Sequence, residues 1–139
     1  MQPCMFNHSF NQQRCAERLL AEYKKYDELI VGIDFDNTIK PINPEHDCEE
    51  IISLLQRCSQ DPKIVLCLWS ICQDEKEIEF KVNYCTERGI KIDYVNTSPF
   101  KMGIGSKQFF NVLLDDRAGL ESAYCNLKYV LDNVESQPN

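Results

Sequence analysis

Four carboxylates and one hydroxyl stand where apolar runs of this sequence end: Asp34 and Asp36, Ser70, and Asp115 and Asp116. In an extended chain, residues two apart point to the same side, so Asp34 and Asp36 would repel each other and resist burial. A cation offsets that repulsion. Oxygen ligands without thiolate or imidazole suit Mg²⁺, which also pairs with phosphate. Lys107, shortly before the last of these runs, would add a positive charge.

The apolar runs that end at these side chains are interpreted as buried strands. The predicted strands are residues 29–34, 64–70, 90–95 and 109–114. Amphipathic spacing predicts helices over residues 11–29, 48–58, 73–89 and 120–134, with Asp47 and Gly89 as caps. This alternation predicts an α/β fold, a three-layer Rossmann-like sandwich with a largely parallel central sheet. In such a fold the carboxyl ends of the strands meet at one crevice, where ligands bind.

Length, composition and charge narrow the class of protein. The chain has 139 residues, which suits one domain with a proper core, and 43% of them are hydrophobic. The net charge of −7 argues against strong non-specific nucleic-acid binding. Because no apolar run approaches the roughly 20 residues of a membrane span and the start does not resemble a signal peptide, we expect a cytoplasmic protein without a membrane partner.

Cysteine is abundant, with eight residues, but its pattern is not that of a zinc site. No CxxC pair occurs, and neither of the two histidines falls at ligand spacing. Cys48, Cys58, Cys85 and Cys125 lie on apolar faces of the predicted helices, where a free thiol behaves as a small hydrophobe. We therefore predict reduced core thiols rather than a disulfide framework.

The motifs at the strand ends resemble those of a known family. DFDNT, residues 34–38, looks like the DxDxT signature of the haloacid dehalogenase (HAD) superfamily of phosphohydrolases. LWS, a lysine upstream of the last strand, and LLDDR then follow in the family's order, so that the resemblance covers about residues 29–120. The domain organisation that we expect is a HAD-like hydrolase domain over residues 29–134, preceded by a helical segment over residues 1–28 packed on the core and followed by a frayed tail over residues 135–139.

The resemblance also implies roles for the four carboxylates. Asp34 would be the nucleophile that becomes an aspartyl phosphate. Asp36 would protonate the leaving oxygen and then activate water. Mg²⁺ would be held by the carboxylates of Asp34 and Asp116 and by the backbone carbonyl of Asp36, with Asp115 as an outer or additional ligand.

Further roles fall to the substrate side of the same site. Ser70 and Thr38 would form the substrate-binding side. Ser70 would hydrogen-bond a phosphate oxygen, and Thr38 would stabilise the loop after the first strand by side-chain to backbone bonds. Lys107 would fix Asp34 and the transferring group, with Lys101 as its rival. Asn37 replaces the family's usual glycine, and asparagine tolerates a left-handed conformation better than most residues.

Many HAD enzymes enclose their substrate with an inserted cap domain, and here the connecting segments are too short for one. Residues 39–46 and 97–106 allow only a flap and a loop. A capless site implies either a bulky phosphorylated substrate, such as a macromolecule, or a small phosphorylated molecule that is closed in by a second copy in a homo-oligomer. The function implied is a Mg²⁺-dependent phosphatase acting on a phosphate monoester.

Two alternatives stay open beside this function. One is a phosphatase of nucleotides or nucleic-acid ends, and the other is a catalytically silent HAD-fold binding protein. A receiver domain would share the acidic pocket and the lysine, but its acidic pair and lone phosphoacceptor do not match a DxD after the first strand. The charged stretch at residues 73–79 is interpreted as a solvated helix face.

Overall fold

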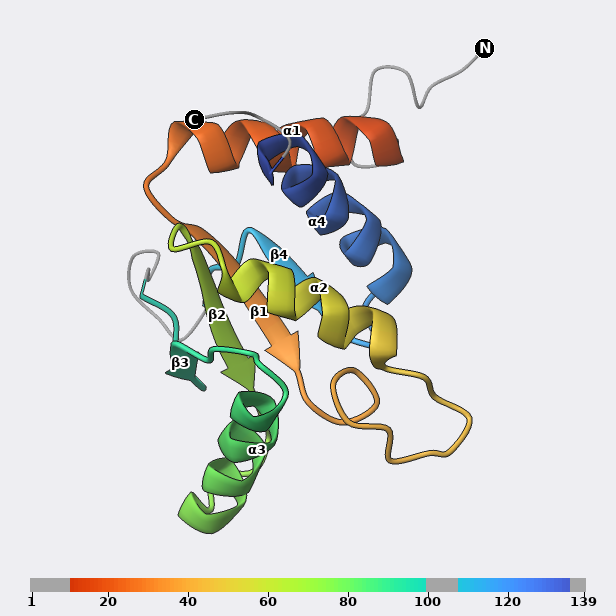
Figure 1. Ribbon diagram of the computed structural model, residues 1–139, viewed down its shortest axis with the longest axis vertical. Coiled ribbons are helices and arrows are strands. Elements are labelled where there is room, and N and C mark those ends of the chain that lie inside the picture. The colour runs from red at the N-terminus through yellow and green to blue at the C-terminus, as the bar shows by residue number, and fades with distance from the viewer. Residues whose placement is uncertain (1–10, 100–107, 136–139) are drawn as a thin grey trace.

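The structure is a computed structural model that describes residues 11–99 and 108–135. Its helices are α1 (Gln12–Lys25), α2 (Glu49–Ser59), α3 (Glu75–Glu87) and α4 (Leu120–Glu135). Its strands are β1 (Leu29–Asp34), β2 (Ile64–Trp69), β3 (Tyr94–Val95) and β4 (Val112–Leu114). They form a four-stranded sheet in the order β3-β2-β1-β4 (Figure 1).

The predicted fold class is confirmed. All strand pairs are parallel, and helices flank the central sheet, an α/β arrangement compatible with a Rossmann-like three-layer sandwich. Five of the six residues of β1, and five of the six of β2, are buried, as expected for central strands covered on both faces. Alternate residues of β1, among them Val31 and Ile33, join the main core with side chains of α1, α2 and α4, such as Leu19, Leu55 and Leu127.

The opposite face of the sheet carries a smaller core. Ile30, Val65 and Cys67 pack there against Phe109 and Phe110, which lead into β4. These two aromatic rings come from the segment that the sequence predicted to be the start of the last strand. The strand begins only at Val112, and the two aromatic residues before it cover the face of the sheet.

A close approach on this second face requires glycine in β1. A Cβ built on Gly32 would lie 2.8 Å from Cγ of Phe110, well inside van der Waals contact. The Phe110 ring also packs edge-on against Trp69, with centroids 5.6 Å apart. Gly32 therefore lets the aromatic cover lie directly on the backbone of the central strand.

Both edge strands are shorter than predicted because side chains take over part of the backbone pairing. The third strand was predicted over residues 90–95, but Leu66 N–H donates to the Asp93 carboxylate at 2.9 Å and pairing starts at Tyr94. At the other edge, Ile30 N–H donates to Oδ1 of Asn111 at 2.7 Å. In each case a side-chain oxygen accepts a bond that a backbone carbonyl would accept in a longer strand.

The four predicted helices are present, with small corrections at their ends. α1 ends at Lys25, four residues before the predicted boundary, and α2 has Cys48 rather than Asp47 as its N-cap residue. The Asp47 carboxylate instead accepts from the N–H of Glu49 at 3.0 Å. Gly89 follows α3 with a φ of 77°, as expected for a C-terminal cap. None of the helices in the described ranges is long and apolar enough to cross a membrane.

The cysteines agree with the prediction of reduced thiols. All seven that lie in the described residues are free, and Cys48, Cys58, Cys67 and Cys85 are buried. Burial raises the pKa of the Cys58 and Cys67 thiols to about 12, so these groups stay protonated and unreactive at neutral pH. Cys125 is only partly buried, and Cys4 lies outside the described residues.

We expect Gly32→Ala to destabilise the protein by about 1–3 kcal/mol, because the new methyl group forces the Phe110 ring away from β1. Urea unfolding measures this free energy. The control is a double-mutant cycle with Phe110→Leu, whose smaller side chain should absorb most of the penalty. An equal cost of Gly32→Ala in both backgrounds would contradict the contact.

Candidate active site

The register of the sheet brings the predicted site residues to one edge. Asp34 pairs with Trp69, the residue before Ser70, and Ile33 pairs with Leu114, the residue before Asp115. The carboxyl ends of the three longest strands therefore meet beside the loop that follows β1, and β2 points toward α3 (Figure 1). This convergence follows from parallel pairing alone.

Three of the four predicted carboxylates form one compact group. Oxygen atoms of Asp34, Asp115 and Asp116 all lie within 4.8 Å of one another, and the three residues are partly buried. The donor set is made only of carboxylate oxygens, without sulfur or imidazole, and so fits a hard divalent cation such as Mg²⁺.

The acidic group is electrostatically costly without a cation. Partial burial, reinforced by the charge of Asp115 and by a hydrogen bond with Asp116, raises the pKa of Asp34 from 3.8 to about 6. A carboxyl group with such a pKa is partly protonated just below neutral pH. A bound cation would favour the ionised form, so proton release and metal binding are coupled at Asp34.

A tight loop after β1 connects the two acidic segments. The Phe35 carbonyl accepts the backbone N–H groups of Thr38, Ile39 and Lys40, at 3.3, 2.9 and 3.1 Å. Thr38 is fully buried, and its hydroxyl oxygen accepts the N–H of Asp116 at 3.1 Å. Thr38 thus makes the predicted kind of side-chain to backbone bond, but to the loop after β4 rather than to its own loop.

Asn37 has an identifiable function in this loop. Its φ is 60°, in the left-handed region, and its Oδ1 accepts the N–H groups of Ile42 at 2.9 Å and Asn43 at 3.1 Å. A glycine would adopt the same backbone conformation but could not make these two bonds. The side chain therefore ties residues 42–43 to the end of the acidic loop.

A pocket of about 240 Å³ opens beside the carboxylates. It is lined by the loop after β1, the end of β2 and the first turns of α3, namely Asp34, Phe35, Asp36, Trp69, Ser70, Ile71, Cys72, Glu77 and Lys81. The side chain of Asp36 is exposed and faces this pocket rather than joining the three clustered carboxylates. Metal binding by its backbone carbonyl stays a prediction.

Ser70 is positioned from two sides. Its N–H donates to Oδ1 of Asn96 at 2.7 Å, while the N–H of Asn96 donates to the carbonyl of Leu68 at 2.8 Å. Its hydroxyl oxygen accepts a hydrogen bond of 2.7 Å from the ammonium group of Lys81. Asn96, with a φ of 55°, thereby holds the chain where β2 ends.

Lys81 is the site residue that the sequence did not reveal. It lies two residues after the charged stretch that was interpreted as a solvated face, and nothing in its spacing distinguishes it from the other charges of α3. Only the packing of α3 against the strand ends brings it into the pocket with Asp34 and Ser70. The two predicted lysines, Lys101 and Lys107, lie outside the described residues.

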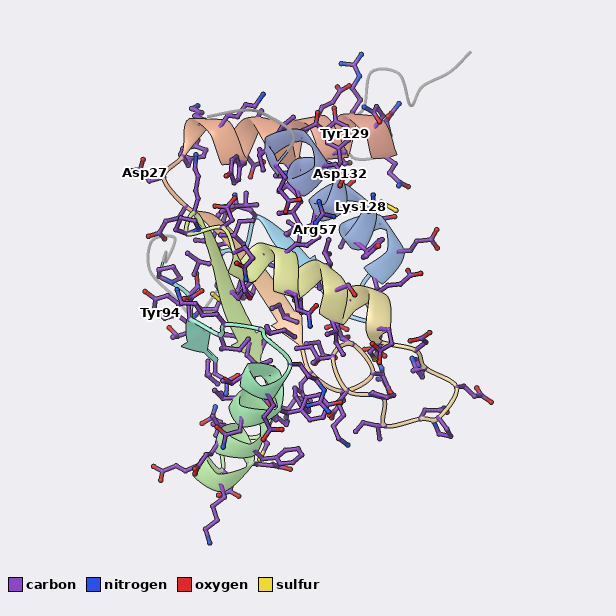
Figure 2. All side chains as sticks on the ribbon, in the orientation of Figure 1. Asp27, Arg57, Tyr94, Lys128, Tyr129 and Asp132 are labelled. Atoms are coloured by element: carbon purple, nitrogen blue, oxygen red, sulfur yellow. The ribbon has the colours of Figure 1, made fainter. Side chains whose placement is uncertain are left out.

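A second hollow of about 240 Å³ lies between α2 and α4. Its cation, Arg57, is already paired with Asp132 and Glu135, each at 2.8 Å, and Figure 2 shows Arg57 and Asp132 lying between the two helices. This hollow contains no cluster of candidate catalytic groups. Of these two hollows, the pocket at the strand ends is therefore the candidate active site.

Comparisons with protein-family models, with curated proteins and with solved structures find no match. The site must therefore be interpreted from its own geometry together with the motifs that it contains. Its defining features are a carboxylate cluster suited to a metal, an adjacent exposed carboxyl group, and a hydroxyl paired with an ammonium group.

We expect Asp34→Asn to stabilise the protein at pH 8 in EDTA, on the order of 1 kcal/mol after allowance for partial exposure. The pKa of Asp34 is raised from 3.8 to about 6 in the folded protein, so folding favours its protonated form. This contribution is present below about pH 4 and is lost as the pH rises through 6.

Thermal unfolding from pH 4 to pH 8 measures the difference between the variant and the wild type. The stabilisation should disappear toward pH 4, and Asp27→Asn, at an exposed position outside the site, should show no such trend. A stabilisation of equal size at both pH values would show that carboxylate repulsion is not its cause.

Asn37 permits a separate prediction about the loop. Asn37→Gly keeps the left-handed backbone and should increase hydrogen exchange at the Ile42 and Asn43 amides with little change in global stability. Asn37→Ala loses the same bonds and must also place an alanine at a φ of 60°, which should cost a further 1–2 kcal/mol, approximately. Equal melting temperatures for the two variants would argue against the left-handed conformation.

Proposed function

We propose that the protein is a Mg²⁺-dependent phosphatase of the HAD superfamily that cleaves a phosphate monoester through an aspartyl phosphate. The observation that carries this proposal is the clustering of Asp34, Asp115 and Asp116, with oxygens within 4.8 Å, beside a pocket that Asp34 lines together with Asp36 and Ser70. A nucleophile, a metal site, an acid and a hydroxyl donor are the groups that such a reaction requires.

Asp34, Asp115 and Asp116 would hold the metal, since they are the described residues whose side chains converge. Bound there, Mg²⁺ would supply positive charge that offsets the repulsion between a carboxylate nucleophile and a phosphate dianion. The hydrogen bond from the Asp116 N–H to Thr38 keeps the loop after β4 against the loop after β1, which preserves the spacing of these ligands.

The first step is attack of an Asp34 carboxylate oxygen on phosphorus. The bond between phosphorus and the leaving oxygen breaks, and the Asp36 carboxyl group gives its proton to that oxygen. In the second step Asp36 takes a proton from water as the water oxygen attacks phosphorus. The bond from phosphorus to Asp34 then breaks, which releases inorganic phosphate and restores the Asp34 carboxylate and the protonated carboxyl group of Asp36.

The placement of Asp36 suits this double role. It follows Asp34 by two residues, yet its side chain is exposed and lines the pocket, while Asp34 is partly buried among the other acids. An exposed carboxyl group can reach both a leaving group and an incoming water molecule. The substrate class that we propose is a phosphate ester whose phosphoryl group enters an open pocket while the rest of the molecule stays outside.

We expect the purified protein to hydrolyse an aryl phosphate with Mg²⁺ and not with EDTA, and Asp34→Asn to abolish turnover because the nucleophile is lost. Asp36→Asn should lower turnover by roughly 10²–10⁴-fold, the usual contribution of a general acid–base group. An aryl oxide leaves without a proton, so this variant should slow mainly the second step. The phosphorylated protein would then accumulate and be detectable by mass spectrometry after an acid quench.

Asp27→Asn is the matched control, since it makes the same chemical change at an exposed position outside the pocket. Turnover that survives in Asp34→Asn would exclude the proposed nucleophile. Mg²⁺ binding without hydrolysis of any phosphate ester would instead indicate a silent binding protein, and absence of both would reject the enzyme altogether.

A further inference from the structure

The hydrogen bond between Lys81 and Ser70 has a fixed donor and a fixed acceptor. The Lys81 ammonium has three donors and no acceptor, so in the 2.7 Å contact the Ser70 oxygen must accept. The hydroxyl proton of Ser70 is then available for another acceptor. Within the described residues, Ser70 is the one hydrogen-bond acceptor of Lys81, and both residues line the pocket beside Asp34.

Lys81 is held in this place by aromatic contacts. Its ammonium nitrogen lies 5.4 Å from the centroid of the Phe35 ring, within the range of a cation–π interaction. Phe35, the residue between Asp34 and Asp36, is buried. Its ring packs edge-on against Tyr84 of α3, with centroids 5.5 Å apart. The same ring thus fixes α3 to the loop after β1 and supports the ammonium group.

The charge of Lys81 is not neutralised by a carboxylate within the described residues. No ion pair joins it to a described Asp or Glu, although Glu77, one turn earlier on α3, lines the same pocket. Lys81 is also partly buried, so its charge is less screened than that of a fully exposed lysine. A partly buried ammonium group whose hydrogen-bond partner among the described residues is a hydroxyl is suited to an anionic ligand.

We infer that Lys81 and Ser70 together form the anion-binding pair of this pocket and that Lys81 binds the phosphoryl oxygens of the substrate. The identity of the ligand, a phosphoryl group, rests on the proposed phosphatase function. The pair itself is defined by the 2.7 Å hydrogen bond and by the position of both residues in the pocket. The ammonium group and the Ser70 hydroxyl would both donate to phosphate oxygens, on the side of the pocket formed by α3. The three carboxylates would carry the metal on the other side.

The experiment measures binding of inorganic phosphate, in the presence of Mg²⁺, by isothermal titration calorimetry. Lys81→Met keeps the length of the side chain and removes its charge, and it should weaken phosphate binding roughly tenfold or more, the effect of losing a charge-assisted hydrogen bond. Lys81→Arg retains the charge and should lose less. Lys76→Met, an exposed lysine of the same helix that does not line the pocket, should bind as the wild type does.

Two further measurements separate binding from a structural role. Ser70→Ala in the Lys81→Met background should weaken binding less than Ser70→Ala alone, since the two donors act as a pair. With an aryl phosphate, Lys81→Met should raise KM by more than it lowers kcat, while its melting temperature stays near that of the wild type.

The outcomes distinguish this inference from the proposed function. Hydrolysis that requires Asp34, together with unchanged phosphate affinity and KM in Lys81→Met, would overturn the inference and leave the phosphatase standing. Phosphate binding that depends on Lys81, without hydrolysis of any ester, would support the inference and reject the proposed phosphatase activity. A wild-type protein that does not bind phosphate would overturn the inference directly.

Discussion

The repulsion among Asp34, Asp115 and Asp116 is the constraint on which the rest of this structure depends. Three partly buried carboxylates with oxygens within 4.8 Å oppose folding unless they are protonated or share a cation. The parallel register places Asp34 and Asp115 side by side, and Thr38 then holds Asp116 through its backbone N–H. The carboxylates therefore lower the stability of the folded state at the strand ends, and the raised pKa of Asp34 reflects this unfavourable electrostatic energy.

Short polar side chains determine where the edge strands begin and where Ser70 lies. Asp93, Asn96 and Asn111 each accept a backbone N–H from a neighbouring strand or its end, at 2.9, 2.7 and 2.7 Å. Each such bond satisfies a donor that would otherwise need a backbone carbonyl in a longer ladder. The two edge strands of the sheet are therefore short, and most of the backbone pairing that positions the site is between the central strands β1 and β2.

The parts that could be predicted from the sequence are those set by local pattern. Continuous apolar runs identified β1 and β2, and helical spacing located all four helices within a few residues. Parallel pairing then implied that Asp34, Ser70 and Asp115 share an edge. The lengths of β3 and β4 could not be predicted, because side-chain oxygens compete there with backbone carbonyls across the sheet. Lys81 was missed because its role depends on how α3 packs, and its own helix contains many similar charges.

The distribution of charge within the pocket makes the proposed binding of an anion compatible with an acidic chain. The net charge of −7 repels polyanions over long distances, yet such repulsion between exposed groups is screened within about 10 Å. At contact distance a phosphate would meet the Lys81 ammonium and the Ser70 hydroxyl on one side and a metal held by carboxylates on the other. Phe35 contacts Lys81, and its neighbours Asp34 and Asp36 line the pocket. The short segment 34–36 therefore connects the ammonium group to the carboxylates. A shift of α3 would therefore move the ammonium group relative to the carboxylates, so the proposed phosphate binding would depend on the packing of that helix.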